Sequence, residues 1–163
     1  MTAKKRLITA KLGIEPDSKV LDIGSGWGGL GLYIKEIGGA ADVLGVTLST
    51  EQLNVARERA REAGVDDSVR FALRDYRHVD GAFDRIVSVG MFEHVGPRYY
   101  GTYFGKCREL LKPDGVMLMH TIGLLDGPWY PNSWLDKYIF PGGQLPPLSE
   151  IVSPVATAGR LVT

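Results

Sequence analysis

The chain has 163 residues, a length that predicts one domain with a single sizeable hydrophobic core. Hydrophobic residues make up 44% and charged residues 23%, a composition typical of globular proteins and unlike that of disordered chains. No apolar run approaches the roughly 18 residues that a membrane helix needs. Nineteen basic residues balance nineteen acidic ones without forming a basic stripe, so no nucleic-acid partner is expected.

Helical and strand patterns alternate along the chain as far as residue 122. The first helix is basic, with Leu7, Ile8 and Leu12 on its apolar side, and Gly13 ends it. Ser49 opens "STEQ", a capping box with Gln52 at the third helical position. The turn "KPDG" at 112–115 precedes the last strand. Helices are expected at 3–12, 28–37, 49–63 and 98–111, and strands at 19–24, 42–48, 68–73, 84–90 and 115–122.

Cys107 is the only cysteine, which excludes an internal disulfide and fits a reducing cytosol. It recurs with Tyr100, Phe104 and Leu111 at helical spacing. We therefore expect Cys107 to be buried in the core and not to act as a nucleophile.

Strands separated by helices predict an α/β fold with a doubly wound, mostly parallel sheet and a ligand crevice at the carboxyl ends of the strands. A single domain is expected over 1–163, in which 123–163 is rich in Pro, Gly and aromatic residues. That segment is too irregular for a regular element and predicts a lid or a substrate wall, with a short helix after Ser153 and Pro154. The fifth strand would have an unpaired edge, which the tail or a second copy of the chain in a homodimer could cover.

The glycine-rich stretch "VLDIGSGWGGL" raises two nucleotide hypotheses. Gly24, Gly26 and Gly29 have the G-x-G-x-x-G spacing of dinucleotide sites, a weak match when it stands alone. Such sites also need an acid near the end of the second strand to bind the ribose. That strand ends in "VTL" at 46–48, without an acid, which disfavours a nicotinamide cofactor.

Asp22 lies two residues before Gly24, where a carboxylate would meet an anionic pyrophosphate. This placement suits a cation better. S-adenosylmethionine carries an ammonium and a sulfonium group, and glycines let the backbone approach such a ligand closely. The alternative is that the glycines only make a tight turn and that Asp22 caps exposed amides.

Polar residues after the second and third strands could complete a cofactor site. Asp75 could accept a hydrogen bond from the adenine amino group, and Tyr76 could lie against the ring. Gln52 could bind the ribose hydroxyls, although its capping-box role needs no ligand. Thr47 and Ser49 are also candidates for cofactor binding, and they too could have a purely structural role.

Several motifs occur together in the order of one family: "VLDIGSGWGGL", "GVTLSTEQ", "RDYR", "SVGMFEHVG", "LLKPDGVMLMHTIG" and "WLDKYIFPGGQLP". Over nearly the whole chain the sequence resembles the cyclopropane-fatty-acyl-phospholipid synthases and related mycolic acid methyltransferases. The resemblance implies transfer of a methyl group from S-adenosylmethionine to a cis double bond of a phospholipid acyl chain, with ring closure after loss of a proton. The resemblance implies no metal. It places the cofactor at Asp22, Gly24, Ser25, Gly26, Trp27, Gly28, Thr47, Leu48, Ser49, Gln52, Asp75, Tyr76 and Gly90.

The resemblance also implies a bound bicarbonate as the general base, held by the Glu of "FEH" and the His of "HTIG", here Glu93 and His120. The two residues follow adjacent strands and could point into one crevice. Taken alone, Glu93 could be a helix-start residue and His120 a core histidine. Aromatic residues could shield a carbocation or merely cover the sheet edge; they are Trp129, Tyr130, Trp134, Tyr138 and Phe140.

Family members generally carry a further segment before the glycine strand and a longer C-terminal part, each with residues near the cofactor or the anion. This chain is therefore expected to present most of the cofactor crevice but to be incomplete as a catalyst. Its expected partner is unsaturated phospholipid, met in the cytoplasm at the inner face of the membrane. Two alternatives stay open: methylation of a small amine, hydroxyl or carboxyl substrate, and a non-catalytic module that binds S-adenosylmethionine.

Overall fold

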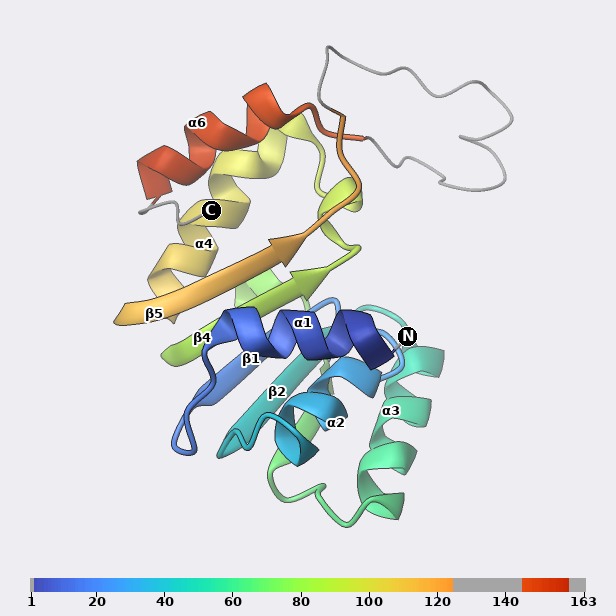
Figure 1. Cartoon of the computed structure of the whole chain (residues 1–163). Helices are drawn as coiled ribbons and strands as arrows, with labels where there is room; N and C mark the ends of the chain where they lie inside the picture. The colour runs from blue at the N-terminus through green and yellow to red at the C-terminus, as the bar shows by residue number, and fades with distance from the viewer. Residues whose placement is uncertain (1, 125–144, 159–163) are drawn as a thin grey trace.

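Five parallel strands form the centre of the structure, in the order β3-β2-β1-β4-β5 (Figure 1). This computed structural model describes residues 2–124 and 145–158. The strands are β1 (Lys19–Ile23), β2 (Asp42–Thr47), β3 (Val69–Leu73), β4 (Phe83–Val89) and β5 (Leu111–His120). The helices are α1 (Thr2–Leu12), α2 (Gly29–Glu36), α3 (Thr50–Glu62), α4 (Tyr100–Leu110) and α6 (Leu148–Ala158), with short 3-10 turns at Tyr76–His78, Phe92–His94 and Pro97–Tyr99.

The core is divided between the two faces of the sheet, which confirms the doubly wound α/β class. On one face, apolar residues of α1, α2 and α3 cluster with residues of β1 to β4, and α1 also contacts β5; on the other face, α4 packs against the sheet and α6 packs against α4. Cys107 belongs to the second face and is 2% exposed, as expected. Burial raises the pKa of its thiol to about 12, so the thiol does not act as a nucleophile near neutral pH.

Three expectations about the elements were wrong in detail. Leu7 is 59% exposed, because only Ile8 and Leu12 of α1 face the sheet. β5 begins at Leu111, before the expected turn and not after it. The turn lies within β5 as a shift in its register with β4, from Phe83↔Leu111 to Arg85↔Val116. The last helix begins at Leu148, so Pro154 lies within α6 and not before it.

The expected lid falls mostly outside the described residues, which omit 125–144 and 159–163. Its five aromatic residues lie in that omitted part. In the described part of the tail, Leu124 and Pro147 form a single parallel bridge at the start of α6. Among the described residues, no helix is long and apolar enough to cross a membrane.

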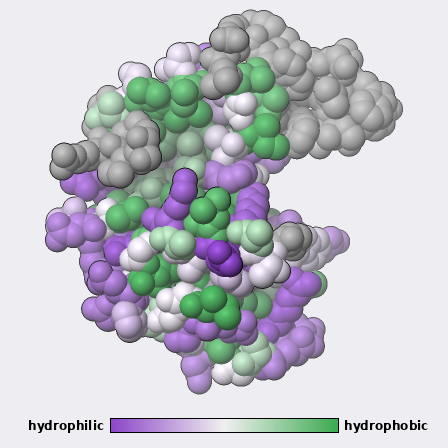
Figure 2. Space-filling model, viewed as in Figure 1, coloured by the Kyte–Doolittle hydropathy of each residue, from purple (hydrophilic) through white to green (hydrophobic). Residues whose placement is uncertain are grey.

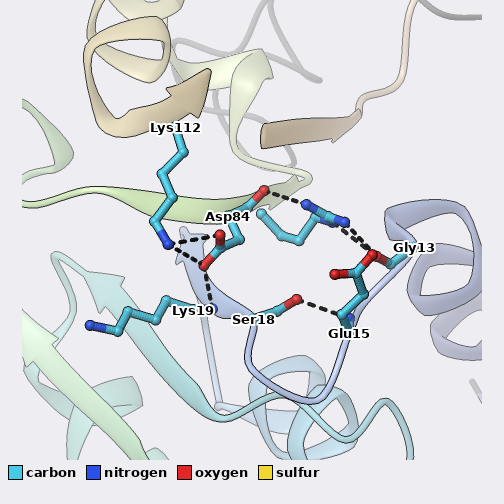
Figure 3. Close-up of polar contacts among 7 residues, drawn as sticks. Gly13, Glu15, Ser18, Lys19, Asp84 and Lys112 are labelled. Carbon is cyan, nitrogen blue, oxygen red and sulfur yellow. Dashed lines mark hydrogen bonds and ion pairs between the residues drawn. The ribbon is translucent and has the colours of Figure 1, made fainter. Parts of the chain in front are cut away.

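A carboxylate at the amino edge of the sheet joins three segments (Figure 3). Asp84 accepts hydrogen bonds from Lys112 Nζ at 2.8 and 2.9 Å and from the Lys19 amide at 2.9 Å. The guanidinium of Arg85 donates to Gly13 O at 2.7 Å. These bonds fix the turn before the regular part of β5 at the edge opposite the ligand crevice.

We expect Asp84→Asn to lower the free energy of unfolding by about 1 to 2 kcal/mol at pH 7, because charge-assisted hydrogen bonds are lost. The Lys112 ammonium and the Lys19 amide hold the pKa of Asp84 below its ordinary value of 3.8. A lowered folded-state pKa stabilises the fold above pH 3.8, and this stabilisation is lost as the pH falls through the lowered pKa. The stability difference between the two proteins in urea unfolding should therefore be present at pH 7 and shrink as the pH is lowered below 3.8; a difference that does not change with pH would contradict the assignment.

Candidate cofactor and catalytic site

The loop after β1 follows a path that requires glycine. Gly24, Gly26 and Gly28 have φ angles of +78°, +54° and +77°, in the left-handed region that disfavours other residues. A Cβ at Gly28 would lie 2.8 Å from both Ala56 Cβ and Phe71 Cζ. The amides of Gly24 and Ser25 both donate to Val46 O at 3.0 Å, which ties the loop to the end of β2.

Asp22 is a buried carboxylate that forms no ion pair with any residue that the structure describes. The residue is 2% exposed, and its Oδ2 atom has no hydrogen-bond partner among the described residues. Desolvation raises its pKa from 3.8 to about 7. The loop amides of Gly24 and Ser25 are already bonded to Val46, so the alternative in which Asp22 caps them does not hold for those two amides. A buried acid with an unused acceptor favours a cationic ligand.

The residues after β2 form a connected polar network. Thr47 Oγ1 donates to Gln52 Oε1 at 2.9 Å and accepts from the Ser49 amide at 3.2 Å. Ser49 Oγ accepts from the Gln52 amide at 3.3 Å, which caps α3. Only this half of the predicted capping box is seen, because the side chain of Gln52 bonds to Thr47 and not to the Ser49 amide. Thr47 thereby holds the Gln52 side chain through Oε1, and Gln52 Nε2 donates no hydrogen bond to the described residues.

Replacing Thr47 by Val should weaken binding of S-adenosylhomocysteine about fivefold, because the isosteric side chain cannot hold Gln52 in its orientation. Thr47→Ser keeps the hydroxyl and is expected to stay within about twofold of the native affinity, so it serves as the matched control. Calorimetric titration measures both. Equal affinities of the Val and Ser variants would show that the network does not position Gln52.

The carboxylate of Asp75 forms hydrogen bonds and an ion pair with Arg77. Its carboxylate accepts from Arg77 N and Nε through Oδ1, at 2.9 and 3.0 Å, and from Arg77 Nη2 through Oδ2, at 2.5 Å. The hydrogen-bonded guanidinium holds the pKa of Asp75 below 3.8, so the residue is an ionised acceptor at neutral pH. Tyr76 is half-buried and its ring meets that of Tyr103 edge-on. The adenine roles of Asp75 and Tyr76 stay predictions.

Glu93 is the second buried carboxylate near the carboxyl ends of the strands. It is 5% exposed, its Oε1 accepts from the Ile122 amide at 2.8 Å, and its Oε2 has no partner among the described residues. Gly90 N donates to His120 O at 2.9 Å, which joins the ends of β4 and β5. His120 is exposed, so it is not a buried core histidine, and its convergence with Glu93 stays a prediction.

The remaining predicted cofactor residues lie around the same edge. Ser25 and Thr47 are buried, whereas Trp27 and Leu48 are 49% and 74% exposed. Met91 lies against the glycine loop, because a Cβ at Gly24 would be 2.8 Å from Met91 Cβ. Sequence analysis missed this residue, since a contact between the ends of β1 and β4 leaves no local signal in the sequence. Lys5 was also missed: a Cβ at Gly29 would lie 3.0 Å from Lys5 Nζ.

Comparison with known proteins gives consistent matches. The family model described as mycolic acid cyclopropane synthetase matches residues 1–163. The cyclopropane-fatty-acyl-phospholipid synthase of Escherichia coli (strain K12) is 48% identical over 149 residues, which are 91% of this chain and 38% of the relative. The chain therefore spans little more than a third of that relative.

Two solved structures extend this similarity to the fold. The cyclopropane synthase MmaA2 from Mycobacterium tuberculosis superposes with a TM-score of 0.88 at 32% identity, covering 99% of this chain and 61% of that chain. Mycolic acid cyclopropane synthase CmaA1, complexed with SAH and CTAB, superposes with a TM-score of 0.87 at 34% identity. The match covers 99% of this chain and 61% of that chain.

Proposed function

Because the chain belongs to the mycolic acid cyclopropane synthetase family, we propose that it forms the S-adenosylmethionine-binding and catalytic part of a cyclopropane-fatty-acyl-phospholipid synthase. The single observation that carries this proposal is the buried Asp22 carboxylate with an unused oxygen beside a left-handed glycine loop. The 48% identity to the Escherichia coli enzyme favours an acyl chain over a small acceptor as the substrate.

S-adenosylmethionine would supply the methyl group, and bicarbonate would supply the base that removes a proton during ring closure on the acyl chain. Asp22 would attract the positive charge of the donor, and the glycine loop would let the backbone approach it. Gln52, held by Thr47, would donate to the ribose hydroxyls. Ionised Asp75 would accept from the adenine amino group.

The residues also fit a small anion that carries a hydroxyl group. Glu93 Oε2 is buried without a partner in the described part of the chain, and a bicarbonate hydroxyl is a donor that would satisfy it. The Glu93 bond to the Ile122 amide would hold the carboxylate in place while the proton moves. His120, exposed at the end of β5, would complete the anion site from the next strand.

We place this activity in the cytoplasm at the inner face of the membrane, where unsaturated phospholipid is available. Calorimetric titration of the chain should show binding of S-adenosylmethionine and S-adenosylhomocysteine and no binding of NAD. A chimera in which this chain replaces the matching segment of the Escherichia coli synthase should add a methylene group to unsaturated phospholipid. Tight binding of NAD, or methylation of a small acceptor without lipid modification, would contradict the proposal.

A further inference from the structure

Helix α1 presents a cluster of positive charge on the surface of the structure. Its sequence TAKKRLITAKL contains four cations and no acid, although the chain as a whole has a net charge of zero. Lys4, Arg6 and Lys11 are exposed, and none of them forms an ion pair within residues 2–124 and 145–158. Together with Leu7 they form what we call the α1 outer face; α1 lies in front of the sheet in Figure 1.

Apolar groups accompany these charges. Leu7 is 59% exposed and lies between Lys4 and Lys11 at i+3 and i+4 spacing, so the three share one side of the helix. A cavity of about 290 Å³ lies between α1 and α2, and Arg6, Tyr33 and Ile37 are among the residues that line it. Figure 2 shows purple and green side chains interspersed over α1 on this face.

The first turn of α1, which carries Lys4, lies on the same side of the sheet as the ligand crevice. The helix begins on the side toward which the strands point (Figure 1), and Lys5 Nζ approaches the start of α2, 5.9 Å from the centroid of the Tyr33 ring. A surface that contacted this helix would therefore lie next to the glycine loop. A ligand held at that surface would have a short path to the carboxyl ends of the strands.

We propose that the α1 outer face docks on an anionic phospholipid surface, with Lys4, Arg6 and Lys11 meeting headgroups and Leu7 entering the interface. Clustered cations bind anionic bilayers electrostatically, and an exposed leucine among them adds apolar burial. Nucleic acid would use the cations but would leave Leu7 unused. The proposal names the docking surface of the proposed lipid-modifying function and rests on that function for its biological purpose.

Vesicle co-sedimentation of the whole chain, without S-adenosylmethionine, tests the docking surface. Vesicles of dioleoyl phosphatidylglycerol and phosphatidylcholine should bind the chain, with affinity that falls as salt is raised, and pure phosphatidylcholine should not. Lys4→Gln/Arg6→Gln should weaken binding about 25-fold, since each charge near an anionic bilayer contributes about fivefold. Arg61→Gln/Arg108→Gln removes the same charge from exposed sites on α3 and α4 and should change binding less than twofold.

Leu7→Ser should weaken vesicle binding about threefold or more without altering its salt dependence, because it removes only apolar burial. Equal binding by the two charge variants, equal binding to both kinds of vesicle, or preferential binding of single-stranded DNA would each overturn the proposal. Failure of the proposed function is separable: a chain that binds vesicles through α1 but does not bind S-adenosylmethionine retains the docking surface and loses only the enzyme assignment.

Discussion

Asp22→Asn is expected to weaken binding of S-adenosylmethionine by roughly 10- to 100-fold at pH 7.5, because the neutral amide cannot pair with the cationic donor. The native affinity should also fall about tenfold for each pH unit below 7, since the protonated carboxyl must lose its proton to bind. The Asn variant should lack this pH dependence. Calorimetric titration from pH 5 to pH 8 measures both effects.

The same substitution should stabilise the unliganded chain. A carboxyl whose folded-state pKa is raised from 3.8 to about 7 destabilises the fold progressively as the pH rises through that interval. Each pKa unit corresponds to about 1.36 kcal/mol, so Asp22→Asn should gain up to about 4 kcal/mol at pH 8, less the cost of burying the amide. Urea unfolding should show this gain at pH 8 and little of it at pH 4. A variant that is less stable at pH 8 and still binds the donor normally would contradict a ligand role for Asp22.

Glu93→Gln is expected to lower ring formation by the chimeric synthase at least about 100-fold, in the range typical for loss of acid–base assistance. The Gln side chain can still accept from the Ile122 amide, so the contact that positions this residue is preserved. What changes is the buried Oε2 atom, which becomes a donor and no longer accepts from a bicarbonate hydroxyl. Mass spectrometry of the lipid product measures the rate.

Glu58→Gln, at an exposed position on α3, is the matched control and should leave the rate unchanged. In the isolated chain, Glu93→Gln should leave the affinity for S-adenosylmethionine within about threefold, because Asp22 and the glycine loop are untouched. Loss of cofactor binding together with ring formation would show that Glu93 supports the fold of the crevice and not the anion.

The sheet could be predicted because each strand is a short apolar run bounded by glycine or polar residues, as "KVLDI" and "DVLGVT" show. The position of Asp22 could be predicted because it lies near the end of the apolar run that forms β1, two residues before Gly24. The Glu93 bond to Ile122 could not, because the residues lie 29 positions apart and meet only when β4 and β5 pair. The exposure of Leu7 was missed because the outer face of α1 lacks a packing partner among the described residues.

The Gln52 prediction shows why a local motif can leave a role undecided. "STEQ" is compatible with a full capping box, in which the Gln side chain is used within the helix. Thr47 lies outside the motif. Its hydroxyl accepts a hydrogen bond from the Ser49 amide and donates one to Gln52 Oε1. Only the folded arrangement of the end of β2 therefore separates the two roles.

The central claim, that an uncompensated buried acid binds a positively charged methyl donor, is tested most directly by proton release on binding. S-adenosylmethionine should be titrated into the chain at pH 6 in two buffers of different ionisation enthalpy. With a pKa near 7 in the free protein, Asp22 should release about 0.9 proton to the buffer when it ionises on binding. Binding with no proton release, or no binding by well-folded chain, would contradict the claim.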